Sequence, residues 1–255
     1  MGVVKSYLRV LPLVLAVSFI VSCAAPGKVS GGTPAEVQTY FTIDDMPDLV
    51  KCLPAPPAWG SSEFAYDSLR YFWGKEQRTD SLRAAQAKSD AVWTLEALFA
   101  SLNEAFGMTL APEETAQIWK LLVTGISTTD LIRVRPKAYF HRLRPFEYFN
   151  DHLLDPSEED ELRGEGSYPS GHTIRGWSVA LLLAEINPDA AGAIYSRGWD
   201  YGESRVIVGA HWQSDVDASR AAASIAYGRL HTSRQFREQM ERAKTEYRKK
   251  LLNTK

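Results

Sequence analysis

Residues 166–186 read GSYPSGHTIRGWSVALLLAEI, a turn rich in glycine and serine that runs directly into an apolar helical pattern. From residue 173 to residue 186 the apolar side chains recur at spacings of three and four, the period of an α-helix. The first amides of a helix have no partner inside it, so they remain free to bind an oxyanion. This stretch predicts a helix whose amino end, together with the Ser170 hydroxyl, forms an anion cradle.

Helical periodicity extends over most of the chain. It also appears at residues 62–73, 80–106, 111–134 and 215–252. Alternating runs of β-branched residues are missing from the sequence, because the run at 206–208 is short and is followed by Gly209. We therefore expect an all-α protein with a single compact helical-bundle domain over residues 37–252.

The composition is that of an ordinary globular protein. The 255 residues are 45% hydrophobic and 24% charged, and this length is sufficient to bury a large core without disulfides. The formal net charge of -2 excludes a chain that binds nucleic-acid polymers through a broadly basic surface. Any anion site must therefore be local and built from a few converging side chains.

The amino terminus has the pattern of a secretory signal peptide over residues 1–22. Lys5 and Arg9 precede an apolar run of roughly 12 residues, whereas a helix that spans a bilayer needs about 20. The run ends in IVSC, which resembles the lipobox of bacterial lipoproteins and predicts lipidation of Cys23. Cleavage as an ordinary signal peptide, with Cys23 unmodified, is the alternative.

Residues 23–36 are rich in Gly, Pro, Ser and Thr, as expected of a flexible tether. These features predict an exported protein of the periplasm that a lipid at Cys23 anchors to a membrane, the outer membrane being one candidate, or otherwise a secreted protein. With Cys23 lipidated or removed, Cys52 has no partner for an internal disulfide.

Two cations stand in the sequence KAYFHRLRPF at residues 137–146. Lys137 and Arg144 are seven residues apart, so on one helix they would point the same way. Pro145 is expected to end that helix and to direct Arg144. By itself such a pair is more often part of a solvated face.

The turn before residue 173 adds hydrogen-bond donors and a histidine. The amide of Gly171 and the hydroxyl of Ser170 complete the cradle, and His172 lies where it can give a proton to a leaving oxygen. The alternative is a plain helix cap. A serine hydrolase is excluded, because its G-x-S-x-G elbow is not met where Gly171 directly follows Ser170.

A second histidine lies in SRVIVGAHWQSD at residues 204–215. His211 and Asp215 are four residues apart, which predicts neighbours on one helical face. The carboxylate then accepts the Nδ1 proton and leaves Nε2 free as a nucleophile. Arg205 precedes a helix break at Gly209 and can contact the same ligand. Most isolated His–Asp pairs of this spacing are structural.

The three clusters together supply three cations, a helix-start cradle and two histidines, which is the set of groups that a tetrahedral oxyanion requires. A metal ion would favour carboxylates and imidazoles without arginines nearby, so His172, His211 and Asp215 do not indicate zinc. We expect no metal and no other cofactor.

The order and spacing of these motifs resemble a known family. K-x6-RP from residue 137, PSGH from residue 169 and SR-x5-H-x3-D from residue 204 resemble the type 2 phosphatidic acid phosphatase superfamily, which includes vanadium haloperoxidases. GSYPSGHT at residues 166–173 is similar to the signature of class A bacterial non-specific acid phosphatases. The similarity continues through residues 53–57 and 139–146.

The resemblance implies a helical bundle of that type and metal-independent hydrolysis of small phosphate monoesters of broad range. His211 would attack phosphorus and form a phosphohistidine with Asp215 orienting it, while His172 would protonate the leaving alcohol and later activate water. The groups that would hold the phosphate oxygens are Lys137, Arg144, Arg205, Ser170 and the amide of Gly171.

Two other functions use the same residues. The resemblance extends to vanadate-dependent haloperoxidases, in which the pocket would keep vanadate as a cofactor. A non-catalytic, lipid-anchored phosphate-binding protein would explain the cations but gives no use for His172 or for the His211–Asp215 pair. The natural substrate and the formation of a homo-oligomer stay open.

Some conspicuous residues outside these motifs receive structural interpretations. Arg142 touches substrate, faces solvent or forms a salt bridge. The tryptophans expected in the core include Trp73, Trp93, Trp119 and Trp177.

Overall fold

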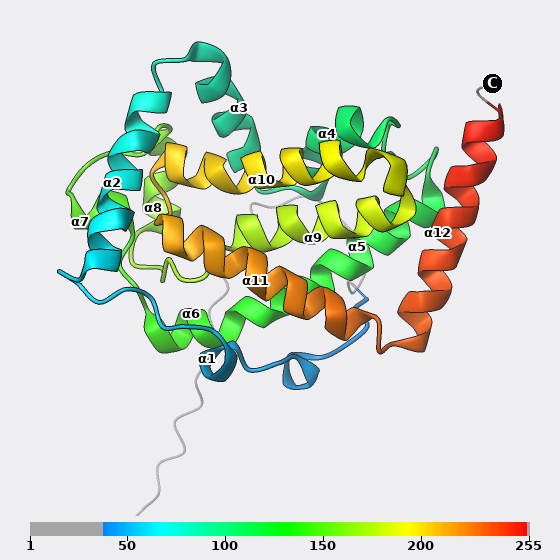
Figure 1. Cartoon of the computed structure of the whole chain (residues 1–255), viewed down its shortest axis with the longest axis horizontal. Helices are drawn as coiled ribbons and strands as arrows, with labels where there is room; N and C mark the ends of the chain where they lie inside the picture. Colours follow the sequence, from blue (N-terminus) through cyan, green and yellow to red (C-terminus); the bar gives the residue numbers. More distant parts are fainter. Residues whose placement is uncertain (1–37, 254–255) are drawn as a thin grey trace, which may run out of the picture. The chain divides into compact units, whose positions relative to one another are not determined.

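The computed structural model describes residues 38–253, which belong to a compact unit spanning Val37–Lys255. Every regular element among these residues is helical, which confirms the expected all-α class (Figure 1). The predicted signal peptide, the tether and Cys23 lie outside the described residues. In chain order the elements are the 3₁₀ turn η1 (Ile43–Asp45), α1 (Leu49–Cys52), α2 (Ser62–Gln77), α3 (Ser81–Ala91), α4 (Leu95–Phe106), α5 (Ala116–Asp130), η2 (Leu131–Arg133), α6 (Val134–Phe140), α7 (Pro145–Tyr148), η3 (Pro156–Glu158), α8 (Glu159–Leu162), α9 (Gly171–Ile186), η4 (Pro188–Ala190), α10 (Ala191–Val208), α11 (Gln213–Leu230) and α12 (Arg234–Asn253).

Helix α9 is the central element of the bundle. It is buried along its whole length, from Thr173 through Leu182 to Ile186. Helices α10 and α11 flank it, and α4 and α5 also pack against it (Figure 1). Ser170 caps the helix, because its hydroxyl accepts a hydrogen bond from the amide of Thr173 at 3.3 Å. The amino end of α9 is therefore fixed inside the protein.

Two glycines let α9 and α10 approach each other closely. A β-carbon at Gly198 would lie 2.6 Å from the Cβ of Ala180, and a β-carbon at Gly176 would overlap the ring of Tyr201. These pairs show that the two helices run antiparallel. The start of α9 and the end of α10 consequently lie side by side, which brings together the second and third sequence motifs.

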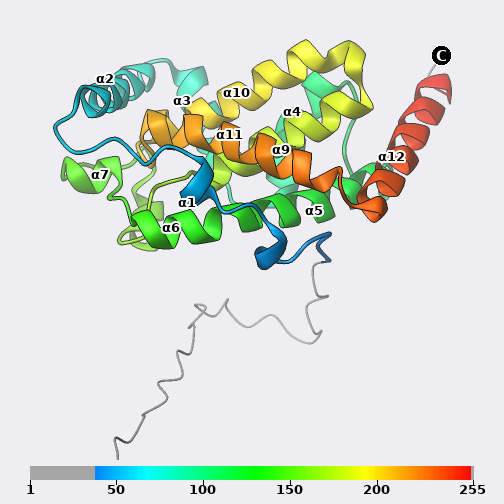
Figure 2. The same cartoon turned by 60° about the horizontal axis from the view of Figure 1, so that its bottom comes forward.

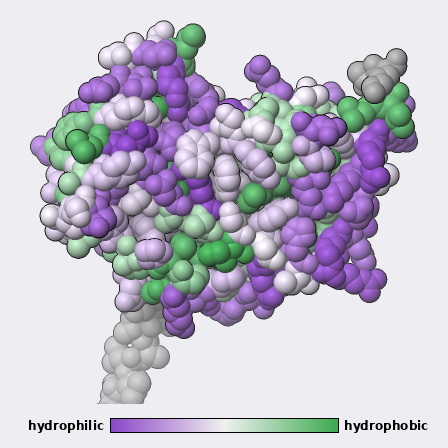
Figure 3. Space-filling view, viewed as in Figure 1, coloured by the Kyte–Doolittle hydropathy of each residue, from purple (hydrophilic) through white to green (hydrophobic). Residues whose placement is uncertain are grey.

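Helix α5 leads through η2 into α6, and Figure 2 shows α5 and α6 following one another along one side of the bundle, beside α9 and α11. This path carries the first motif toward the start of α9. Helix α12 packs along α5 through buried Phe236, Met240 and Ala243. Its outer surface is largely hydrophilic, apart from a hydrophobic patch near its carboxyl end (Figure 3).

Two of the expected helical stretches are divided in the structure, and one observed helix, α10, was not among those expected. The stretch at 80–106 is interrupted between α3 and α4, where Thr94 caps α4 by accepting a hydrogen bond from the amide of Ala97 at 3.2 Å. The stretch at 215–252 divides into α11 and α12. The sequence of α10 does not show a clear helical pattern of apolar residues, because charged residues such as Glu203 and Arg205 occupy buried positions of this helix.

No helix within residues 38–253 combines the length and the apolar character that crossing a bilayer requires.

Replacement of Gly176 by valine should destabilise the fold by about 1–3 kcal/mol or more, because the new side chain overlaps the Tyr201 ring. Urea unfolding of the purified protein measures this loss. Gly228→Ala is the matched control: Gly228 is exposed with no atom close to its absent β-carbon, so alanine should stabilise α11 by about 0.5–1 kcal/mol. Equal stabilities for Gly176→Val and the unmodified chain would contradict the close-contact interpretation.

Candidate active site

A pocket with a volume of about 350 Å³ lies where α9 begins and α10 ends. Most of the residues predicted to form the site line this one pocket: Lys137, Arg144, Gly171, His172, Arg205 and His211. Asp215 and Ser170 are fully buried directly behind its wall. The tertiary fold thus brings together side chains from α6, the start of α7, α9, α10 and the segment before α11.

Arg205 forms the most unusual part of the pocket. Its side chain is 0% exposed, yet no described residue accepts a hydrogen bond from Nε, Nη1 or Nη2. The nearest carboxylate oxygen, on Glu158, is 3.8 Å from Nη2. A buried guanidinium without acceptors is costly, because the donors have lost water and gained no replacement. Arg205 is therefore arranged to receive an anion.

Two further cations surround the same space. Arg144 donates from Nε to the carbonyl oxygens of Leu162 and Glu165, and from Nη1 to that of Ala210. Burial, and then the neighbouring Arg205, lowers the pKa of Arg144 to about 10. Lys137 donates from Nζ to the carbonyl of Gly166 at 2.5 Å, and burial together with the guanidinium of Arg144 lowers the pKa of Lys137 to about 7.

The expectation that Lys137 and Arg144 share one helix ending at Pro145 is wrong. Helix α6 ends at Phe140, since His141 adopts a left-handed conformation with φ of 40°. Pro145 instead begins α7. The backbone N–H at the first position of a helix makes no hydrogen bond within the helix, so proline is tolerated there. Arg144 stands immediately before that helix, and the turn between the two helices directs both cations into the pocket.

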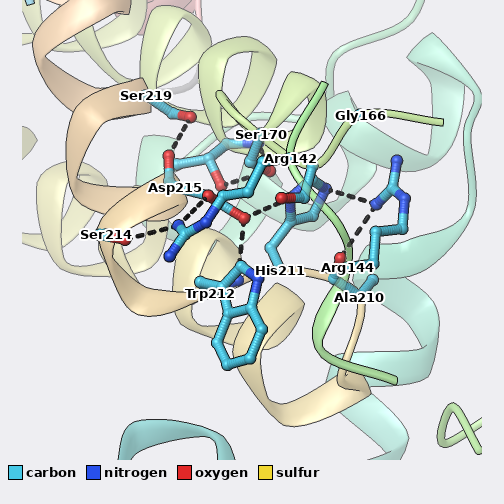
Figure 4. A network of polar contacts seen from close by, with 12 residues as sticks. Arg142, Arg144, Gly166, Ser170, Ala210, His211, Trp212, Ser214, Asp215 and Ser219 are labelled. Atoms are coloured by element: carbon cyan, nitrogen blue, oxygen red, sulfur yellow. Dashed lines mark hydrogen bonds and ion pairs between the residues drawn. The ribbon is translucent and has the colours of Figure 1, made fainter. Parts of the chain in front are cut away.

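His211 lies among these cations and is only 2% exposed. Its Nε2 is 3.2 Å from Nη1 of Arg144, and its Nδ1 is 3.4 Å from Oδ2 of Asp215 (Figure 4). Because a guanidinium only donates, Nε2 must accept and Nδ1 must carry the proton. Burial and the positive charge of Arg144 and Lys137 hold the pKa of His211 well below its usual value. The imidazole is thus neutral, with a lone pair on Nε2.

The His211–Asp215 contact is therefore present, although His211 precedes α11 and the two residues do not share a helical face. Asp215 lies in the first turn of α11, where Oδ2 accepts a hydrogen bond from the amide of Trp212 at 2.9 Å. This bond fixes the carboxylate beside the imidazole.

Behind Asp215 lies a buried chain of alternating charges. Arg142 donates from Nη1 to Asp215 at 2.6 Å and from Nη2 to Asp67 at 2.7 Å (Figure 4 shows the Arg142–Asp215 part). Asp67 also accepts from the amide and hydroxyl of Ser214. Of the three roles open for Arg142, the salt bridge is observed. Asp67 has no signal in the sequence, because it reaches this site from α2.

His172 lies on the opposite side of the pocket. Its Nε2 donates to the carbonyl of Ala91 at 2.9 Å, and its ring lies 4.4 Å from the ring of Trp93. Burial and the charge of Arg205 hold the pKa of His172 well below its usual value. The expected core position of Trp93 is wrong, since this side chain is 42% exposed and lines the pocket. Trp93 lies in the break between α3 and α4, and the sequence signal for that break was Thr94, a residue type that caps helices.

Within the described part of the chain, His, Cys, Asp and Glu side chains nowhere gather in threes as ligands of a metal ion. The oxygen atoms that accept hydrogen bonds from Arg144 belong to backbone carbonyls. Metal-independent chemistry stays a prediction.

Comparison with known proteins identifies the family. Residues 116–238, which include the three motifs, match the PAP2 superfamily. The chain is 40% identical to a non-specific acid phosphatase of Providencia stuartii over 82% of this chain and 85% of the relative. It is 36% identical to the non-specific acid phosphatase of Salmonella typhimurium over 87% and 89% of the two chains.

The chain belongs to the non-specific acid phosphatases of the PAP2 superfamily. An acid phosphatase of Zymomonas mobilis, 38% identical over 77% of this chain and 74% of the relative, agrees with this assignment. The predictions of a PAP2-type helical fold and of a phosphatase, a phosphoric monoester hydrolase, are confirmed.

Replacement of Arg142 by glutamine should lower kcat by roughly tenfold or more, because Asp215 loses the cation that holds it beside His211. The inhibition constant for inorganic phosphate should change little, since Arg142 does not line the pocket. Arg142→Lys keeps the charge and should restore part of kcat. Arg163→Gln, on a half-exposed arginine, is the control. Parallel losses of kcat and phosphate binding in folded Arg142→Gln would contradict a positioning role.

Proposed function

We propose that this acid phosphatase is exported and hydrolyses phosphate monoesters of broad range through a phosphohistidine on His211, without a metal ion. The observation that carries the proposal is the buried Arg205, which has no hydrogen-bond acceptor among the described residues and lines the same pocket as His211. A phosphoryl group in this pocket supplies the missing acceptors, and its phosphorus faces a neutral imidazole.

In the first step the lone pair on Nε2 of His211 attacks phosphorus. A P–N bond forms, the ester P–O bond breaks, and the leaving oxygen takes a proton from His172. Lys137, Arg144 and Arg205 neutralise the charge on the equatorial oxygens, with donors from Gly171 and Ser170. Asp215 stabilises the positive charge that develops on the imidazole of His211.

In the second step water attacks the phosphohistidine. His172 accepts a proton from that water, the P–N bond breaks, and inorganic phosphate leaves. Since Ala91 already binds Nε2 of His172, the proton transferred in both steps is the one on Nδ1. The low pKa of His172 in the free pocket means that acidic conditions favour its protonated form, which is the form required for the first step.

Substrate hydrolysis tests the proposal directly. The protein without residues 1–22 should release p-nitrophenol from p-nitrophenyl phosphate at acidic pH, with or without EDTA, and vanadate should inhibit it. His211→Ala should lose activity by about 10³-fold or more. Wild type quenched in alkaline detergent, but not His211→Ala, should retain labelled phosphate in a bond that is stable to base and labile to acid.

Different outcomes identify the alternatives. Loss of activity with EDTA would overturn metal independence. Phosphate binding without turnover would favour the non-catalytic binding protein, and bromide oxidation by peroxide in vanadate-loaded protein would favour the haloperoxidase.

Export and the lipid anchor are part of the proposal and rest on residues 1–23 alone. Expression of the full chain with Cys23→Ser should release the enzyme from the membrane fraction if Cys23 carries the anchor.

The cation of Lys137 gives a pH dependence to phosphate binding. Its pKa of about 7 means that it is charged below neutral pH and uncharged above it. Inhibition by inorganic phosphate should therefore weaken as the pH rises from 5 to 9, and less so in Lys137→Arg, whose side chain stays charged. Phosphate itself ionises in the same way in both experiments, so this contribution cancels in the ratio of the two inhibition constants. Lys120→Arg, at an exposed position, is the control. Identical profiles for all three proteins would contradict this role of Lys137.

A further inference from the structure

The mouth of the pocket has two unlike walls above a cationic floor. One wall carries Glu158, Glu161 and Glu165, which come from η3, α8 and the loop that follows. A second wall, which is apolar, is formed by Val92 and Trp93 from the break between α3 and α4. A phosphoryl group bound to Arg205 and His211 must direct the rest of its ester between these walls.

The acidic wall is not neutralised at the mouth. Glu161 and Glu165 are exposed, whereas Glu158 is partly buried and forms an ion pair of 3.8 Å with Arg205. The additional cation that lines the mouth, Arg133, donates from Nε and Nη2 to Asp130 at 2.7 and 3.1 Å. Arg133 is thus already paired with a carboxylate. A second anionic group on the substrate would face Glu161 and Glu165, whose carboxylates form no ion pair with another described residue.

The apolar wall is exposed and held in place. Val92 and Trp93 are 47% and 42% exposed, so this wall presents apolar surface at the mouth of the pocket. The guanidinium of Arg175 lies 3.4 Å from the centre of the Trp93 ring and donates to Asp130 at 2.9 Å. This stacking fixes the indole next to His172, where the leaving group departs.

We propose that Trp93 and the acidic wall select the leaving group: the enzyme prefers esters whose leaving group is aromatic and neutral or cationic, and it discriminates against a second phosphate or carboxylate. This inference rests on the proposed function, because it takes His172 as the acid that marks the leaving-group side. Aromatic groups gain contact with the fixed indole, and the glutamates repel a second anion.

The test compares substrates that share the phosphoryl group. They are p-nitrophenyl phosphate, glycerol 2-phosphate, phosphoethanolamine and fructose 1,6-bisphosphate. Glu161→Lys should raise kcat/KM for the bisphosphate, relative to glycerol 2-phosphate, by about three- to tenfold. The same change should lower kcat/KM for phosphoethanolamine relative to glycerol 2-phosphate. The gain should shrink in 0.5 M salt, because exposed charges are screened.

Asp160→Lys is the matched control for the acidic wall. Asp160 neighbours Glu161 on α8, is exposed, and does not line the pocket, so the same change in net charge should alter the ratio less than about twofold. Equal effects of Glu161→Lys and Asp160→Lys would overturn the acidic-wall part.

Trp93→Ala tests the apolar wall. It should lower kcat/KM for p-nitrophenyl phosphate by about three- to tenfold more than for glycerol 2-phosphate. If Trp93 acts only by holding His172 in place, Trp93→Ala should lower kcat/KM for both substrates by the same factor. That result would overturn the inference. Absence of turnover on every ester by the unmodified enzyme would instead overturn the proposed function.

Discussion

Positive charge that converges on one pocket is the constraint that the surrounding structure satisfies. Arg205 lowers the pKa of Arg144, Arg144 lowers that of Lys137, and burial removes the water that would screen them. Carbonyl oxygens take the place of counterions for two of the three cations, and they come from helix ends and turns, where such oxygens are free. The pocket therefore lies where elements begin and end. The carbonyls belong to Leu162, Glu165, Gly166 and Ala210.

The charged residues on the two sides of His211 differ in how well they are paired and hydrogen-bonded. Behind it, Asp67, Arg142 and Asp215 alternate in sign, so each buried charge has an ionic partner and its hydrogen bonds are largely satisfied. In front of it, Arg205 has one distant ionic partner, Glu158 at 3.8 Å, and no hydrogen-bond acceptor among the described residues. The compensated side fixes the orientation of the imidazole. On the other side, burial and the cations hold the pKa of His211 low, and we propose that an anion binds there.

The charge of the residues that line the pocket changes from positive at its floor to negative at its mouth. Its cationic floor suits a phosphoryl group, whereas the carboxylates of Glu158, Glu161 and Glu165 face the remainder of the ester. We therefore propose that one site binds a dianion and opposes a second one. A basic surface of uniform sign would bind polyanions without distinguishing them. The acidic overall charge of the chain is consistent with this local arrangement.

The sequence by itself determined the helical class, the helix that begins after Ser170, and six of the residues that line the pocket, because these depend on periodicity, capping and short motifs that act over a few residues. It did not reveal that Pro145 begins a helix, that Trp93 lines the mouth, or that Asp67 completes the charge chain behind Asp215. Those features depend on contacts between segments far apart in the chain. Burial and the close approach of α9 and α10 determine such contacts, and local patterns carry no record of them.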